Sequence, residues 1–148
     1  MKQIGGGVET KPTKDNALGL VYRKNGSFES ICQRLQDSLM VGKNYKIVLS
    51  ASISEKYMSR VAGEPFEQNF DDRLVVEIWM GSTVCHEALL AGRTNEIDHK
   101  EWKEYSFEFI ADEAYDHIFI RVNSIDNRTN ILGHVLIDWV SDIKCLDP

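Results

Sequence analysis

The residues with the clearest capacity for chemistry are a tryptophan and a glutamate on one side of a strand-like segment. Trp79 and Glu77 have the same parity within residues 73–80. The other parity is wholly apolar and consists of Leu74, Val76, Ile78 and Met80. Successive side chains of a strand point to opposite faces of its sheet, so Trp79 and Glu77 are expected on the outer face. An outward indole can pack on the C–H face of a sugar ring while charged neighbours bond the hydroxyls.

Three further residues are candidates for the same binding face. Arg121 and His117 alternate with aliphatic residues in a second strand-like segment, and Arg23 ends an apolar run near the N-terminus. With Glu77 they would supply the hydrogen bonds around Trp79. The candidate ligand-binding set is therefore Trp79, Arg121, Glu77, Arg23 and His117.

Residues 54–72 offer an alternative fate for this tryptophan. The segment lacks strand periodicity and contains Gly63 and Pro65 among mixed polar residues, which predicts a long loop. Long loops in compact domains are often functional. A large aromatic side chain commonly packs under such a loop, so the sequence leaves two states for Trp79: an open platform, or coverage by this loop.

Sequence motifs for catalysis and metal chelation are absent. No G-x-S-x-G, P-loop, H-x-H or H-E-x-x-H pattern occurs. A glycoside hydrolase needs two carboxyl groups flanking one bond, but the loop carboxylates Asp71, Asp72 and Asp112 are more simply explained as solvated. The residues favour binding over catalysis, and we assign no catalytic residue.

The three cysteines, Cys32, Cys85 and Cys145, show no pairing signal. Their number is odd and no two have C-x-x-C spacing. Free cysteine is commonly buried, so each is expected to be a free or buried thiol.

Alternating apolar and polar residues recur along the chain and predict strands. The predicted strands are 17–24, 28–35, 45–53, 73–80, 88–91, 102–110, 117–122 and 131–143. In the two central aromatic and aliphatic runs, the inward side chains would be Tyr105, Phe107, Phe109, Ile118, Ile120 and Val122. Asn25-Gly26 is a strong hairpin signal, so the strand at 28–35 is expected to pair with the strand at 17–24.

Short strands at near-regular spacing predict an all-β domain. An antiparallel β-sandwich of the jelly-roll type suits this length and protects most strand edges. We expect residues 1–16 to form an N-terminal arm or edge strand and residues 17–148 to form the sandwich. No segment has helical periodicity over two turns or more.

Charge and composition limit the classes of partner that this chain is expected to bind. The chain has 148 residues and a formal net charge of -6, without a basic cluster, which argues against nucleic acid as a partner. No apolar run is long enough to span a bilayer, so membrane insertion is not expected. The first seven residues lack a signal-peptide core. This predicts either a cytoplasmic protein or a domain excised from a larger envelope or extracellular protein.

Several segments, in order, resemble a known family. Residues 42–47, Gly-Lys-Asn-Tyr-Lys-Ile, are similar to the entry to a central strand in galactose-binding-like domains. Trp102 and the alternation that follows it resemble the W-x-x-Y-x-F-x-F run of that superfamily, and residues 135–140 resemble its closing strand. The family includes many carbohydrate-binding modules, and related jelly rolls occur in bacterial envelope proteins.

The resemblance also implies a cofactor. Members of this family often hold a structural calcium ion through an aspartate of the closing strand and oxygens near the first strand. Asp138 matches the closing position, and Gly6-Gly7-Val8-Glu9 resembles the opening segment, which makes Glu9 a second candidate ligand.

We therefore expect a non-catalytic module whose outer sheet face binds carbohydrate. The alternative is a structural or protein–protein interaction module of a larger envelope protein. The sequence does not predict the oligomeric state.

Overall fold

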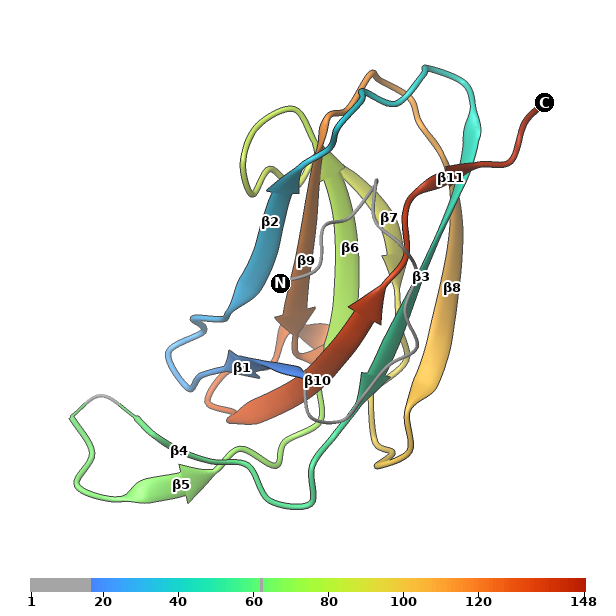
Figure 1. Ribbon diagram of the computed structural model, residues 1–148. Coiled ribbons are helices and arrows are strands. Elements are labelled where there is room, and N and C mark those ends of the chain that lie inside the picture. Colours follow the sequence, from blue (N-terminus) through green and yellow to red (C-terminus); the bar gives the residue numbers. More distant parts are fainter. Residues whose placement is uncertain (1–16, 62) are drawn as a thin grey trace.

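Two antiparallel β-sheets pack face to face in this chain (Figure 1). The computed structural model describes residues 17–61 and 63–148, so the arm predicted at 1–16, and Glu9 within it, lie outside the described residues. The strands are β1 (Leu18–Tyr22), β2 (Ser30–Arg34), β3 (Asn44–Ser52), β4 (Met58–Arg60), β5 (Glu67–Asn69), β6 (Val75–Gly81), β7 (Leu89–Arg93), β8 (Lys103–Ile110), β9 (His117–Asn123), β10 (Gly133–Val140) and β11 (Lys144–Cys145).

Strands that follow each other in the sequence often lie in different sheets. Sheet A has the order β1-β10-β3, with β8 on the far side of β3 and β11 beside the beginning of β3. Sheet B has the order β2-β9-β6-β7. All of these strand pairs are antiparallel. The predicted antiparallel β-sandwich is confirmed.

The predicted alternation places the core between the two sheets. Ile47 and Leu49 of β3 face Ile78 of β6 and Ile118 and Ile120 of β9, and all are fully buried. Burying one such side chain contributes about 1.5–3 kcal/mol relative to leaving it exposed. Tyr105, Phe107 and Phe109 of β8 also pack on this core, which confirms the inward parity predicted for them.

Helical structure is limited to one 3-10 turn, Ile125–Asn127, within the described residues. In those same ranges no helix has the length and apolar character needed to cross a bilayer.

The hairpin predicted around Asn25-Gly26 is only partly correct. The turn forms, with Gly26 at φ +85°, a left-handed conformation that glycine adopts without strain. However, the pairing beyond the turn is short: it consists of the isolated bridge between Tyr22 and Phe28 and a main-chain hydrogen bond from Glu29 to Val21. β1 then pairs with β10 and β2 pairs with β9, because the chain leaves one sheet for the other immediately after the turn.

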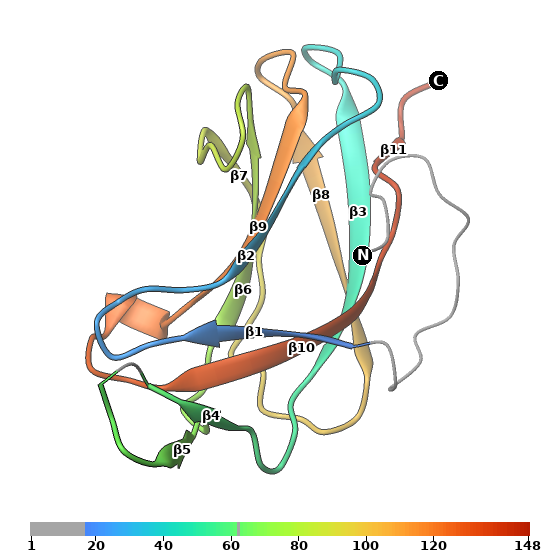
Figure 2. The same ribbon diagram turned by 60° about the vertical axis from the view of Figure 1, so that its left-hand side comes forward.

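Residues 54–72 are not an irregular loop but contain the β4–β5 ribbon at one end of the sandwich (Figure 2). Tyr57 anchors this segment on sheet A. Its ring stacks on His134 of β10 at 4.4 Å between centroids and lies over Gly19 of β1. Coverage of Trp79 by residues 54–72 was one of the two alternatives. The segment packs against sheet A, whereas Trp79 belongs to sheet B.

The expectation of free thiols is wrong for two of the three cysteines. Cys32 of β2 and Cys85 form a disulfide, and Cys145 is free and exposed. The two cysteines are 53 positions apart in the sequence, and that separation carries no pairing signal. Their pairing depends instead on tertiary structure, which brings the loop between β6 and β7 onto β2.

That connection, residues 82–88, is the β6–β7 loop, and it crosses the outer face of sheet B. β9 lies between β6 and β2, so Cys85 reaches Cys32 only by passing over β9. The main chain at His86 comes so close to Gly81 that a Cβ there would lie 2.4 Å from the His86 carbonyl oxygen. Glycine at position 81 is therefore needed for the loop to fold back over the sheet.

Removing the disulfide should lower the free energy of unfolding. We expect the double variant Cys32→Ser and Cys85→Ser to lose about 2–4 kcal/mol, because the crosslink restricts the unfolded chain. Urea denaturation measures the loss. Cys145→Ser is the matched control and should unfold at the parent's midpoint; equal midpoints for the parent and the double variant would contradict the crosslink.

Candidate functional site

The outer face of sheet B carries polar and aromatic side chains in neighbouring registers of its four strands. Glu77 of β6 lies directly between Arg121 of β9 and Arg93 of β7. Two residues further along β6, Trp79 lies opposite Phe119 of β9. These residues have the outward parity, so the strands themselves bring them together.

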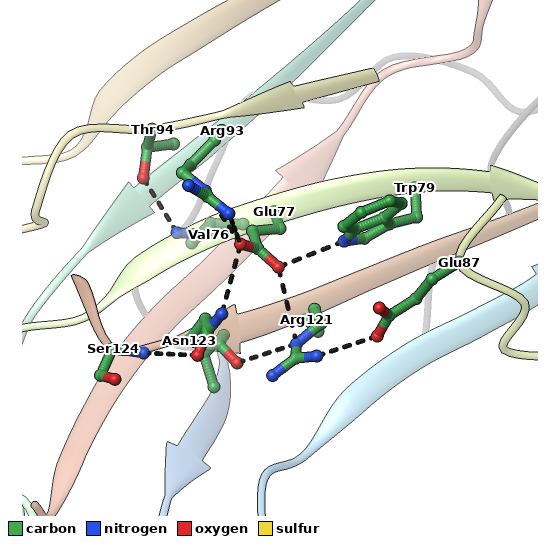
Figure 3. A network of polar contacts seen from close by, with 10 residues as sticks. Val76, Glu77, Trp79, Glu87, Arg93, Thr94, Arg121, Asn123 and Ser124 are labelled. Atoms are coloured by element: carbon green, nitrogen blue, oxygen red, sulfur yellow. Dashed lines mark hydrogen bonds and ion pairs between the residues drawn. The ribbon is translucent and has the colours of Figure 1, made fainter. Parts of the chain in front are cut away.

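Glu77 is the centre of a hydrogen-bonded network (Figure 3). Its carboxylate accepts bonds from the Trp79 indole at 3.2 Å, from Arg93 Nε at 2.8 Å and from Asn123 Nδ2 at 3.3 Å. Arg93 Nη2 also pairs with it, and Arg121 Nε lies 3.7 Å away. Although only 1% of Glu77 is exposed, its charge is fully compensated. A buried charge is tolerated when it is paired and hydrogen-bonded in this way.

The network lowers the pKa of Glu77. Burial by itself would raise that pKa, since it disfavours the ionised carboxylate. Hydrogen bonds from Trp79, Arg93 and Asn123, together with the positive charge of Arg93, outweigh burial and hold the pKa below its ordinary value of 4.5. Glu77 is therefore an ionised, fixed acceptor at neutral pH and not a proton donor.

Arg121 connects this network to the β6–β7 loop. Its Nη1 donates to Glu87 of that loop at 2.8 Å, and its guanidinium lies 3.7 Å from the ring centroid of Phe28. Phe28 also packs beside Phe119, with 6.4 Å between ring centroids. Phe119 is buried although it has the outward parity of β9, because Phe28 packs beside it.

Trp79 is half-buried at the border of this covered region. Its indole nitrogen is held by Glu77, and its register partner on β7 is Leu90, which is exposed. The Arg93 side chain, on the same edge of the sheet, is 52% exposed. The accessible part of the face therefore combines an aromatic ring, an aliphatic side chain and a guanidinium.

The structure brings only part of the predicted ligand-binding set together. Trp79, Glu77 and Arg121 belong to one network. His117 has the same parity, but it lies at the beginning of β9, two residues before Phe119, and it pairs with Asp116 at 2.7 Å. Arg23 lies in the turn after β1 and pairs with Glu29 at 3.3 Å, so the described contacts do not join it to Glu77.

Sequence reasoning missed three members of this network. Arg93 ends β7, but the strand predicted at 88–91 stops before it because Gly92 breaks the apolar run. Glu87 and Asn123 come from a loop and a strand end, where no periodicity exists to assign a face. The one available signal was outward parity on β6, which predicted Glu77 as an acceptor without naming its donors.

The predicted calcium ligand on the closing strand has an unusual environment. Asp138 is buried, and neither of its carboxylate oxygens has a hydrogen-bond partner. It sits at an irregularity in the pairing of β10 with β3, between Ile137 and Trp139. An unpaired buried carboxylate suits a cation ligand. Calcium takes six to eight oxygens, however, and the described residues contain no group of three or more His, Cys, Asp or Glu side chains suited to a metal.

Comparison with known proteins supports the fold. No family model matches the sequence, and no curated protein matches it. Among solved structures, the C-terminal domain of EclA, a sugar-binding protein, is similar with a TM-score of 0.52 and 14% sequence identity, over 93% of this chain and 81% of that chain. At that identity the similarity establishes a shared architecture only.

A second solved structure is a Stig cyclase, Fisc from Fischerella sp. TAU, in complex with an indole compound. It is 18% identical over 90% of this chain and 77% of that chain, with a TM-score of 0.42. A similarity of that size supports no inference about function.

Replacing the central carboxylate should change how stability depends on pH. The pKa of Glu77 is lower in the folded state than its ordinary value of 4.5, so the ionised carboxylate stabilises the fold above about pH 4.5. This stabilisation is lost as the pH falls through the pKa of the folded state. We expect Glu77→Gln to lower the free energy of unfolding by about 1.5–3 kcal/mol at pH 7, with a smaller difference from the parent at pH 3.

Urea denaturation of both proteins across this pH range measures the effect. Glu108→Gln, which alters an exposed carboxylate on β8, is the control and should follow the parent at every pH. A constant difference between the parent and Glu77→Gln from pH 7 to pH 3 would show that the charge of Glu77 is not what stabilises the network.

Proposed function

We propose that this chain is a non-catalytic carbohydrate-binding module whose ligand lies against Trp79 on the outer face of sheet B. The observation that carries the proposal is the fixed orientation of this half-buried indole, held by Glu77 beside the exposed parts of Leu90 and Arg93. The similarity in fold to a sugar-binding domain supports it.

The chemistry of this edge suits a neutral sugar. The indole and Leu90 offer an apolar surface for the C–H face of a pyranose, and Arg93 offers donors for its hydroxyls. Because Arg93 already pairs with Glu77, its charge is largely compensated and does not demand an anionic ligand. Arg121 and Glu77 position these groups, since both are mostly buried within the network.

The ionised state of Glu77 supports binding without catalysis at this face. Hydrolysis of a glycosidic bond needs a protonated carboxyl group beside an ionised one. The lowered pKa of Glu77 makes it unsuited to donate a proton. His117 pairs with Asp116, and Arg23 lies in the turn after β1 and pairs with Glu29; contact of either residue with a ligand remains a prediction.

The disulfide favours an oxidising compartment. Such bonds persist in envelope, periplasmic and extracellular proteins and are rare in the cytosol. Of the two localisations expected from the sequence, the link between Cys32 and Cys85 supports an envelope or extracellular protein.

A glycan array tests the proposed site. The parent should bind neutral glycans, and Trp79→Ala should weaken that binding by about 2 kcal/mol, or roughly thirtyfold, because the stacking surface is lost. Trp79→Phe should retain most of the binding. Phe66→Ala is the control, since Phe66 is 70% exposed near the β4–β5 ribbon and should not affect binding. If the parent binds no glycan, the proposal fails, and a protein partner becomes the better account of the face.

Calcium is a separate proposal, which rests on the unpaired carboxylate of Asp138. If a cation binds there, calcium must raise the melting temperature of the parent above its value in chelator, because only the folded state binds it. Asp138→Asn should abolish that difference. Identical melting temperatures of the parent in calcium and in chelator, with Asp138→Asn more stable than the parent, would instead indicate an uncompensated buried charge.

A further inference from the structure

The two oxygens of the Glu77 carboxylate have different neighbours in the network of Figure 3. Oε2 accepts from both Arg93 and Asn123. Oε1 accepts from the Trp79 indole at 3.2 Å, and Nε of Arg121 lies 3.7 Å from that same oxygen. A separation of 3.7 Å is too long for a hydrogen bond. The indole is therefore bonded to an oxygen that a guanidinium approaches but does not reach.

Arg121 is held at that distance by contacts on its other sides. Its Nη1 donates to Glu87 of the β6–β7 loop at 2.8 Å, and its Nε donates to the Val122 carbonyl at 3.4 Å. The guanidinium also lies over the Phe28 ring. The bond to Glu87 is the shorter of the two hydrogen bonds and joins opposite charges, so it contributes most to the position of the arginine.

Without Glu87, Arg121 would compete with Trp79 for Oε1. A hydrogen bond between a guanidinium and a carboxylate is stronger than one donated by a neutral indole. A movement of about 1 Å would bring the guanidinium within hydrogen-bond distance of that oxygen. The half-buried indole would then lose the bond that fixes its orientation. Trp79 thus keeps its acceptor only while the loop carboxylate occupies the arginine.

The disulfide determines where Glu87 lies. Glu87 is two residues from Cys85, and the bond from Cys85 to Cys32 of β2 carries the β6–β7 loop across β9. This path places the loop carboxylate beside Arg121. Cys85 is exposed, and exposed disulfides are among those that thiols reduce most readily.

We propose that Glu87 is a positioning residue for the Trp79 site and that reduction of the bond between Cys32 and Cys85 weakens carbohydrate binding there. This inference rests on the proposed function, because it concerns the same site. In the reduction a dithiol supplies two electrons and two protons. Its own two sulfurs join, the bond between the two cysteines breaks, and both become thiols. The released loop takes Glu87 with it, and the indole loses its acceptor to the guanidinium.

The indole ¹H–¹⁵N signal of Trp79 in the full chain tests this coupling without a ligand. Reduction by dithiothreitol should shift the signal and speed the hydrogen exchange of the indole. Glu87→Gln should do the same with the disulfide intact, and Glu87→Asp, which keeps the charge, should restore part of the parent's behaviour. Trp102 precedes β8 and Trp139 lies on β10, both strands of sheet A, so their indole signals should stay in place while the sandwich is intact.

Glycan binding is the second readout, with the neutral glycan that the parent binds most tightly on the array as the probe. Reduction should weaken this binding roughly tenfold, within the range usual for coupled sites. Glu87→Gln should weaken it about threefold, since the ion pair is partly exposed. Val84→Ala is the matched control and should behave as the parent, because Val84 is 68% exposed in the same loop and no described contact joins it to Arg121.

The coupling is overturned if the Trp79 indole signal is the same in the parent, the reduced chain and Glu87→Gln. It is also overturned if a glycan that binds the parent binds the other two equally well. If reduction unfolds the chain, all three indole signals move, and Glu87→Gln then decides. A parent that binds no glycan contradicts the proposed function instead, and the indole signals decide the coupling by themselves.

Discussion

Burial of alternate side chains between two sheets is the constraint on which the rest of this structure depends. Ile47, Ile78 and Ile120 can be fully buried only if their strand neighbours point outward. The inward face fixes the register, since a slip of one residue would exchange the two faces. Each sheet must therefore present its other parity outside the core, and the strand residues of the candidate site, Glu77, Trp79, Arg93 and Arg121, have that outward parity.

The outward parity alone does not make a binding surface, because most of it is covered or internally paired. On sheet B the disulfide holds the β6–β7 loop across β9, and Phe28 packs beside Phe119. What stays accessible is the edge beside Trp79, whose ring is positioned by Glu77. The same carboxylate that fixes the tryptophan also neutralises Arg93, so the network sets both the geometry and the low net charge of the proposed site.

Local periodicity explains why much of the fold was predictable. The strands around Leu49, Ile78 and Ile120 alternate strictly, so their faces could be assigned from the sequence. Pairing could not be assigned that way: Asn25-Gly26 predicts a turn, but which strands pair beyond it depends on which sheet each one joins. Trp79 and Glu77 were found by parity, whereas Arg93 and Cys85 were missed because their positions depend on a strand end and on a loop.

Carbohydrate binding at the accessible edge beside Trp79 can be observed residue by residue. The most direct measurement is a ¹H–¹⁵N titration of the parent with a neutral oligosaccharide, following the three tryptophan indole signals and the Arg93 side-chain Nε signal. If carbohydrate binds at this edge, the Trp79 indole and Arg93 Nε signals shift together, while the Trp102 and Trp139 indole signals stay in place. Saturable binding that leaves Trp79 and Arg93 unshifted and moves signals elsewhere would contradict it.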